Sequence, residues 1–407
     1  MHHNISLIAT IASALGFGLI FGFIAARLKL PPLVGYLVAG ILIGPATPGF
    51  IADVGLAGQL SEIGVMLLMF GVGLHFSLDD LLEVRGIALP GAIIQITAAT
   101  ALGMGVAHLW GWGWGAGLVF GMSLSVASTV VLLRALEDRG ILDTVNGRIA
   151  VGWLVVEDLV TVLLLVLLPP LSGWLGGDAA GGDKSIWLTL ALTLGQVAAF
   201  IVLMLVVGRK LFPWLLWQVA RTGSRELFTL CVVAVAVGIA YLSSTLFGVS
   251  FALGAFFAGM VMRESELSHR AAQESLPLRD AFSVVFFVSV GMLFDPAILL
   301  QKPLELLMVV AIIIVGKSLA AFAVVILLRY PAKTALTVSA SLAQIGEFSF
   351  ILIALGVSLK LVPPVAQSLV LAGAIISIAL NPLVFSAMPS IRRWAESNSA
   401  LARRLGS

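Results

Sequence analysis

The chain has 407 residues, of which 60% are hydrophobic and 11% are charged, and its formal net charge is +2. A water-soluble globule of this length has no room to bury so large an apolar fraction, so the composition excludes a soluble protein. Apolar runs of 18 or more residues recur along the chain, and each is long enough to cross a hydrocarbon core of about 30 Å. The sequence therefore predicts an all-α polytopic membrane protein, and we expect no nucleic-acid partner.

The first apolar run has neither the basic start nor the small-residue cleavage site of a signal peptide, so we predict that it is the first membrane span. Charged or Pro/Gly-rich breaks separate the later runs. The second and ninth runs are short for a bilayer, so we expect helices that are tilted or shielded by neighbours. The thirteen predicted spans are 5–26, 32–45, 58–77, 87–109, 113–134, 148–170, 186–208, 225–243, 249–262, 280–294, 304–328, 333–356 and 363–387.

The basic residues predict the orientation of the chain in the membrane. An odd number of spans puts the two termini on opposite sides. With the C-terminus in the cytoplasm, nineteen Lys and Arg residues face the cytoplasm, three face out, and Lys317 lies within a span. This split follows the positive-inside rule, so we expect a multi-pass protein of the bacterial inner membrane with its N-terminus outside.

The two halves of the sequence resemble each other. LVAGILIGP at 37–45 is similar to FFAGMVMRE at 256–264, and SLSVASTVVLL at 123–133 to SLAQIGEFSFI at 341–351, with an offset near 218 residues. Seven spans separate each pair, so the second copy crosses the membrane in the opposite sense, as in many secondary transporters. The predicted organisation is a first six-span repeat (1–185), a linker span (186–224), a second six-span repeat (225–390) and a basic cytoplasmic tail (391–407).

Three charged residues fall near the centres of predicted spans: Glu157, Asp158 and Lys317. A charge at a helix centre costs roughly 2.5 to 3.5 kcal/mol, so these residues need partners or a function. Neighbours on a helix point about 100° apart, so both acids cannot face one partner. We hypothesise that Lys317 pairs with Glu157 in one state and that Asp158 is the principal site for a monovalent cation. The alternative is a static ion pair that fixes helix packing.

A buried carboxylate can couple a cation to a proton. Burial favours the neutral form of a carboxyl group, whereas a nearby positive charge favours its ionised form. A proton and a cation therefore exclude each other on one group, which is the thermodynamic requirement for exchange.

The matched segments at 123–133 and 341–351 are unusually polar for the middle of a membrane. We predict an unwound centre in each, with the two breaks crossing, Glu347 offsetting the positive end of a half-helix, and freed carbonyls helping to coordinate a cation. In the alternative interpretation the Ser and Thr hydroxyls bond back to their own helix. The polar residues in these segments are Ser123, Ser125, Ser128, Thr129, Gln344 and Glu347, together with Gly346.

Other patterns carry no chemistry. VGKS at 315–318 lacks the earlier glycine of a phosphate-binding loop, and no nucleophile with an adjacent base or metal-ligand cluster is visible, so we expect no enzyme and no cofactor. Gly18 and Gly22 form a GxxxG that predicts a helix-packing face.

Several motifs together resemble the monovalent cation:proton antiporter-2 family, and in particular its Kef/YbaL-type branch. They include LPPLVGYLVAGILIGP at 30–45, LMFGVGLHFSLDDL at 68–81, WLVVEDLV at 153–160 and AQIGEFSFIL at 343–352, and they are specific when taken together. The resemblance implies an antiporter fold of the NhaA and NapA type. It also implies a homodimer in which one bundle of each protomer is a scaffold and the other moves as an elevator.

The resemblance assigns roles to individual residues. Asp158 takes the position of the ion-binding aspartate, Glu157 the position before it, Lys317 that of the membrane lysine and Glu347 that of the acidic residue near the crossover. Kef-type systems tend to have Gln at the position of Glu157 and electrogenic sodium exchangers Asp.

The resemblance implies a secondary active antiporter that exchanges K⁺ or Na⁺ for H⁺, with K⁺ preferred. Kef-like relatives tend to carry a cytoplasmic nucleotide-binding regulatory domain after the membrane part, and we expect none within this chain. The alternative function is a gated potassium efflux channel, which needs a continuous wet path and no obligatory protonation.

Overall fold

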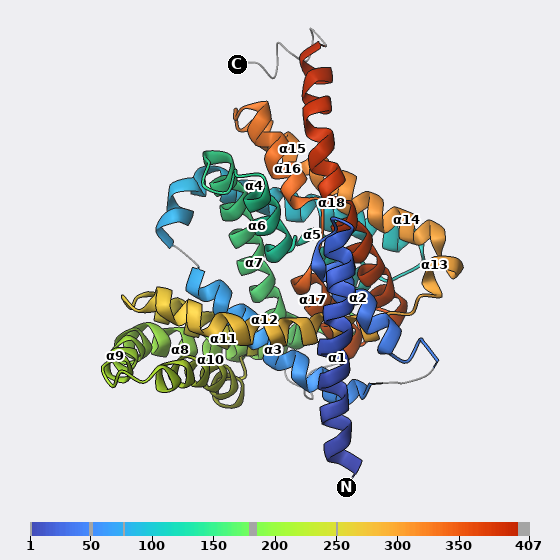
Figure 1. The fold of residues 1–407 in the computed structure, drawn as a ribbon. Helices are drawn as coiled ribbons and strands as arrows, with labels where there is room; N and C mark the ends of the chain where they lie inside the picture. Colours follow the sequence, from blue (N-terminus) through green and yellow to red (C-terminus); the bar gives the residue numbers. More distant parts are fainter. Residues whose placement is uncertain (1, 49–51, 76–77, 179–184, 250, 398–407) are drawn as a thin grey trace. The chain divides into compact units, whose positions relative to one another are not determined.

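The computed structural model describes residues 2–48, 52–75, 78–178, 185–249 and 251–397. These residues form helices joined by loops, with no strand among them, which confirms the predicted all-helical class. In chain order (Figure 1) the helices are α1 (His2–Arg27), α2 (Pro32–Ile43), α3 (Val54–His75), α4 (Leu78–Leu109), α5 (Trp114–Ser125), α6 (Thr129–Asp138), α7 (Val145–Leu171), α8 (Ile186–Leu203), α9 (Arg209–Ala220), α10 (Arg225–Phe247), α11 (Phe251–Arg263), α12 (Ser268–Met292), α13 (Ile298–Gln301), α14 (Pro303–Ala311), α15 (Lys317–Leu327), α16 (Ala332–Leu342), α17 (Glu347–Ser358) and α18 (Pro364–Ser397), with π-helical turns η1 (Met204–Gly208) and η2 (Ile312–Gly316).

The prediction of a multi-pass membrane protein is confirmed. Nine helical stretches in the described part of the chain are long and apolar enough to cross a membrane, or ten if the bent pair α16 and α17 is one span. Three shorter apolar helices, α2, α5 and α11, coincide with predicted spans but do not meet this criterion alone. The total of thirteen spans therefore stays a prediction, as do the inverted repeats and the orientation of the termini.

The chain divides into two compact units. The first unit comprises Met1–Leu28, Gly35–Phe76 and Gly181–Leu293, and the second comprises Lys29–Val34, Ser77–Ala180 and Phe294–Ser407. Each unit draws on both halves of the chain, so this division is a different one from the predicted repeats, whose boundaries stay predictions. All of the predicted ion-site and crossover residues belong to the second unit.

Small residues allow close helix packing in the first unit, where α3 packs along α11 and α12 and α1 packs along α12. A Cβ atom on Gly22 would lie 2.6 Å from Tyr36 Cε1, and one on Gly18 would lie 2.8 Å from Val284 Cγ1. The glycines therefore admit neighbouring side chains, as small residues do at helix interfaces in membranes. Their predicted role as a packing face is confirmed.

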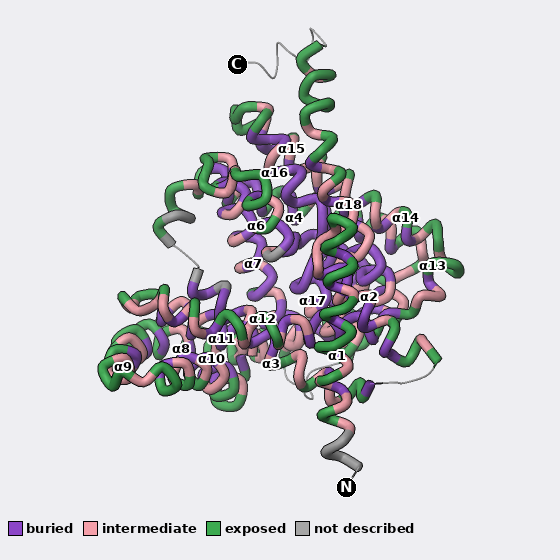
Figure 2. Tube along the Cα trace, in the orientation of Figure 1, coloured by how far each residue is buried: buried purple, intermediate pink, exposed green. Residues whose placement is uncertain are grey.

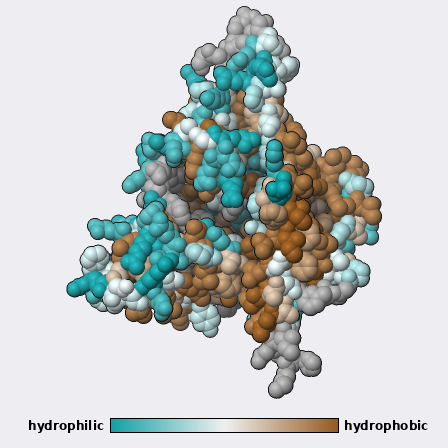
Figure 3. Space-filling model, viewed as in Figure 1, coloured by the Kyte–Doolittle hydropathy of each residue, from teal (hydrophilic) through white to brown (hydrophobic). Residues whose placement is uncertain are grey.

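Two stretches of the first unit are strongly apolar but contain few buried residues. An 18-residue window of Ile186–Ala220, which comprises α8, η1 and α9, has a mean hydropathy of 2.5, and only 11% of its residues are buried. In the corresponding window of Ser6–Arg27 in α1, 22% are buried. Leu19 and Phe23 are among the exposed side chains of α1, and the surface over this helix is hydrophobic in Figure 3. Lipid is the solvent that suits such surfaces.

The core of the second unit forms around Trp153 of α7, which is fully buried. Apolar side chains of α4, α6, α15, α16 and α18 surround it, including Ile87, Leu132 and Phe385. In Figure 2 the traces of α7, α16 and α17 are largely buried. Their apolar sides are used for packing within the unit, so the polar groups on these helices are withdrawn from lipid.

Both predicted helix breaks are present. The first separates α5 from α6 at residues 126–128, and the second separates α16 from α17 at 343–346, where the two helices bend by 49°. Ser128 caps α6 by accepting a hydrogen bond from Val131 N at 3.3 Å, as Ser commonly does at a helix start. The breaks meet closely, because a Cβ on Gly346 would lie 2.3 Å from Ser128 Cβ.

Candidate ion site at the helix crossover

The two acidic residues of α7 form hydrogen bonds to two different residues at the first break. Glu157 is fully buried and Asp158 is 4% exposed. Glu157 Oε2 accepts a hydrogen bond from Ala127 N at 3.0 Å, and Asp158 Oδ2 accepts one from Thr129 Oγ1 at 3.1 Å. The 100° between neighbouring positions of a helix thus directs the two carboxylates to two points of one loop.

Each carboxylate keeps one oxygen free. Glu157 Oε1 and Asp158 Oδ1 are buried and have no hydrogen-bond partner among the described residues. A buried polar atom without a partner costs about 1–3 kcal/mol, and more if it is charged. A proton or a cation on these oxygens removes that cost, so the pair has the chemistry of a site for either.

Gln344 and Glu347 tie the second break to the first. Gln344 Oε1 accepts a hydrogen bond from Ser128 N at 2.7 Å, and its Nε2 donates to Ser128 O at 3.3 Å. Ser128 Oγ donates to Glu347 Oε2 at 2.9 Å. The amide of Gln344 therefore supplies the acceptor that Ser128 N lacks at the start of a helix, and adds a second donor to Ser128 O, which also accepts from Leu132 N. The predicted crossover residues are brought together.

The carboxylate of Glu347 lies where two helices begin. Glu347 is the first residue of α17, and its side chain also contacts the backbone N–H of Thr129, the first residue of α6. Helix N-termini carry partial positive charge, so an acidic side chain at this place stabilises both half-helices.

Three carbonyls at the first break each accept a hydrogen bond from a side chain, and one of them, Ser128 O, also accepts from Leu132 N of α6 at 3.1 Å. Ser349 Oγ donates to Val126 O at 3.2 Å, Gln344 Nε2 to Ser128 O, and Gln95 Nε2 to Ser125 O at 3.1 Å. Among the side chains that the structure describes at the crossover, the buried acceptor oxygens without a hydrogen bond are those of the two carboxylates. The expectation that freed carbonyls help to coordinate a cation stays a prediction.

The hydroxyls that precede the first break bond within their own helix. Ser123 Oγ donates to Val119 O at 2.8 Å and Ser125 Oγ to Met122 O at 2.7 Å. This is the alternative interpretation stated for membrane Ser and Thr residues. Ser128 and Thr129 instead reach across to Glu347 and Asp158, so the polar residues of this segment divide between the two roles.

Lys317 is fully buried and directly follows the π-helical turn η2. Such turns often occur at functional sites. Lys317 Nζ donates to Gln344 O at 2.9 Å, so the lysine holds the second break. No ion pair of Lys317 with Glu157 occurs among the described residues. Pairing of these two residues in another state stays a prediction.

The sequence offered little to single out Gln95 and Ser349. Gln95 is an uncharged residue in an apolar helix and belongs to no matched motif. Ser349 lies within the matched segment 341–351, but its partner Val126 is distant in sequence, as Ser125 is from Gln95. Only the contact itself reveals the role. The signal that could have identified Gln95 is its amide side chain near the middle of a predicted membrane span, where such a group needs a hydrogen-bond partner.

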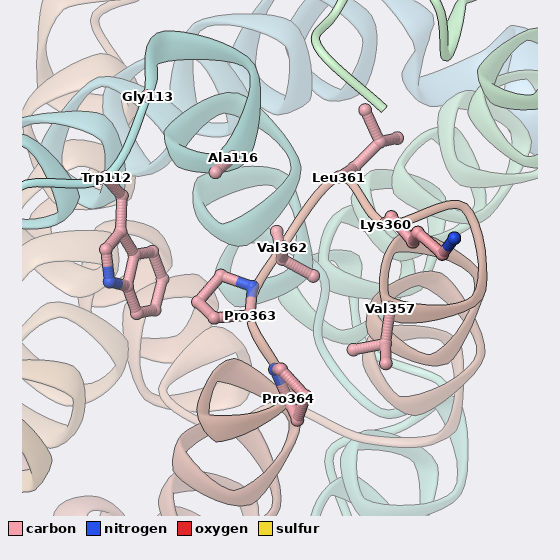
Figure 4. A pocket seen from close by; sticks show the side chains of 9 residues that line it. All are labelled: Trp112, Gly113, Ala116, Val357, Lys360, Leu361, Val362, Pro363 and Pro364. Atoms are coloured by element: carbon pink, nitrogen blue, oxygen red, sulfur yellow. The ribbon is translucent and has the colours of Figure 1, made fainter. Parts of the chain in front are cut away.

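A separate pocket of about 410 Å³ lies at the ends of α5 and α17 that are remote from the breaks (Figure 4). Trp112, Val357, Pro363 and Pro364 form apolar walls, and Lys360 is at the same pocket. Lys360 Nζ pairs with Asp178 at 3.3 Å. None of the crossover carboxylates lines this pocket, so it is not the ion site.

Comparison with known proteins identifies the family. The model of the transmembrane sodium/hydrogen exchanger family matches residues 11–389. The chain is 59% identical over 387 residues to a protein of Escherichia coli (strain K12) named "Putative cation/proton antiporter YbaL", covering 95% of this chain and 69% of that protein. It is 33% identical over 402 residues to K(+) efflux antiporter 4 of Arabidopsis thaliana, covering 97% of this chain and 66% of the relative. The chain thus spans about two thirds of the length of these relatives.

A solved structure shares the fold. The sodium proton antiporter MjNhaP1 from Methanocaldococcus jannaschii, determined at pH 8, matches with a TM-score of 0.73 at 16% identity, and the match covers 94% of this chain and 98% of that one. The sequence and structural comparisons agree, and the chain belongs to the transmembrane sodium/hydrogen exchanger family, within which it resembles the Kef/YbaL-type antiporters.

Proposed function

We propose that this chain is a secondary active antiporter in which a monovalent cation and a proton compete for Glu157 Oε1 and Asp158 Oδ1. The observation that carries the proposal is the pair of buried carboxylate oxygens without partners at the crossing of two broken helices. A charge at this depth is unstable unless it is neutralised. Either ion neutralises it, and each excludes the other.

The named relatives support this function and its ion. YbaL carries the name of a cation/proton antiporter, and the Arabidopsis relative carries that of a K(+) efflux antiporter. We propose K⁺ as the transported cation, because the chain is more similar in sequence to these proteins than to the sodium antiporter that shares its fold. Na⁺ is the alternative, since Glu157 is neither the Gln of Kef-type systems nor the Asp of sodium exchangers.

An elevator movement of the second unit fits the arrangement of the site. All the hydrogen bonds that hold the carboxylates and the two breaks join residues of this unit. The site can therefore travel as one body without breaking them. The proposal includes a homodimer with the first units as scaffold, in a bacterial inner membrane with the C-terminus in the cytoplasm.

The test is cation-induced proton flux in proteoliposomes, with K⁺, Na⁺ and Li⁺ titrated separately and Asp158→Asn beside the wild type. We expect K⁺ to dissipate a pH gradient through the wild type and the variant to be silent, because Asn cannot exchange a proton for a cation. Wild-type exchange by Asp158→Asn would contradict the site. Cation flux without proton movement would instead select the channel.

A further inference from the structure

Gln95 connects the first helix break to α7. Its side chain is fully buried in α4. Gln95 Nε2 donates to Ser125 O at 3.1 Å, and its Oε1 accepts from Trp153 Nε1 at 3.3 Å. The indole N–H is only a donor, so it fixes which end of the amide is oxygen and leaves the NH₂ group for the carbonyl.

The packing around Trp153 is built for this contact. Gly91 lies one turn before Gln95 on α4, and a Cβ atom there would be 2.3 Å from Trp153 Cζ3. Only a residue without a side chain lets the ring approach α4 so closely. The same face of α4 therefore provides space for the indole ring at Gly91 and a hydrogen-bond acceptor for its N–H at Gln95.

Trp153 and Glu157 lie one turn apart on α7, so they share a face of that helix. Glu157 Oε2 holds Ala127 N, and Trp153 holds Ser125 O through Gln95. α7 is thus attached to the break at three points: at Ala127 N through Glu157, at Thr129 Oγ1 through Asp158, and at Ser125 O through Trp153 and Gln95. The Gln95 contact is the one of these three that holds the α5 end of the break, on the side that the carboxylates do not reach.

We propose that Gln95 is a positioning residue of the ion site, which acts through Trp153 and sets the affinity for the cation. With the loop fixed, Glu157 Oε2 accepts the hydrogen bond from Ala127 N, and Oε1 remains available to the ion. Without Gln95, Ser125 O loses its side-chain donor and the α5 end of the break shifts relative to α7, which weakens the alignment of Ala127 N with Glu157. The inference deepens the proposed function and rests on it.

The first experiment measures exchange kinetics of Gln95→Met in proteoliposomes. We expect the KM for the cation to rise about fivefold, the size of one neutral hydrogen bond, with the maximal rate retained. Gln196→Met is the matched control, because Gln196 is exposed on α8 in the first unit. An unchanged KM, or a lower maximal rate at constant KM, overturns the positioning role.

Two further variants separate positioning from folding. Trp153→Phe keeps an aromatic ring at this position but removes the N–H together with part of the indole. It breaks the contact from the other side, so it raises KM in the same direction even if Gln95→Met folds poorly. In a Glu157→Gln background, Gln95→Met adds no further change in KM, because the oxygen that Gln95 positions has become an amide group. Additive effects of the two substitutions overturn the claim that Gln95 acts through Glu157.

Hydrogen exchange of the peptide that contains residues 122–130 provides a readout that is independent of transport. Gln95→Met accelerates exchange of this segment and Gln196→Met does not, since only the former releases the break. Unchanged exchange overturns the attachment itself. If the wild type transports no cation against protons while the exchange result holds, the proposed function fails and the attachment stands without a role in ion affinity.

Discussion

Glu157 and Asp158 are neighbours with different surroundings. A backbone N–H holds the first carboxylate, and a hydroxyl holds the second. A backbone donor is fixed by the fold, whereas the hydroxyl of Thr129 can rotate to donate or to accept. Asp158 can therefore keep Thr129 as its hydrogen-bond partner in both protonation states, and this difference supports its assignment as the principal ion site.

Thr129→Val tests that difference. The substitution removes the donor to Asp158 Oδ2 at nearly constant volume, so the ionised carboxylate loses a hydrogen bond worth about 1.5–3 kcal/mol. We expect weaker cation binding, with a KM at least tenfold higher in proteoliposome exchange. Thr337→Val is the control, because that hydroxyl bonds back to Lys333 O on its own helix. Equal effects of the two variants would contradict a specific role for Thr129.

Competition predicts how pH changes cation affinity. Lowering the pH should raise the KM for the cation, by up to about tenfold per pH unit for one competing proton, while the maximal rate at saturating cation is unchanged. The measurement is a series of cation titrations between about pH 6 and pH 9. A KM that does not respond to pH would show that the two ions bind independently.

At the scale of helices, the sequence was most informative where polar residues occur near the middle of a predicted membrane span. The breaks in α5/α6 and α16/α17 follow from Ser, Gln and Gly residues in segments that are otherwise long enough to span, and both are present. The exact partners did not follow. Lys317 bonds to Gln344 O in this state, and Gln95 and Ser349 satisfy freed carbonyls, because such contacts depend on side-chain reach between helices that sequence does not specify.

Gly346 tests the crossing of the helices. A Cβ atom at this position would lie 2.3 Å from Ser128 Cβ, so Gly346→Ala should force the breaks apart and cost about 1–3 kcal/mol of stability. We expect a lower melting temperature in detergent and impaired exchange. Gly105→Ala is the matched control, because no atom lies within 4 Å of a Cβ atom there. A variant at Gly346 as stable and active as that control would show that the crossing tolerates separation.

At the scale of the whole molecule, ion binding should stabilise the fold. A ligand that binds only the folded state adds about 2.7 kcal/mol at a hundred times its Kd. We therefore expect K⁺ to raise the melting temperature of the detergent-solubilised wild type by a few degrees relative to choline at equal ionic strength. Asp158→Asn should show no difference between the two salts. An equal rise in that variant would place the stabilising ion elsewhere.

The class of protein could be predicted from hydropathy, because the bilayer imposes length and polarity on every span. The number of spans could not be settled in the same way. α2, α5 and α11 have 12, 12 and 13 residues, fewer than a straight crossing requires. How these short helices fit into the bilayer depends on their packing against neighbouring helices, and the composition of the sequence does not specify that packing.

All the contacts that hold the crossover carboxylates lie within the second unit. In the proposed mechanism, choice of ion and speed of transport are consequently separable traits. Substitutions in the first unit would then alter the rate of transport while the cation that is transported stays the same. Descendants of one ancestral chain could therefore adapt to membranes of different thickness or fluidity while keeping the same ion selectivity.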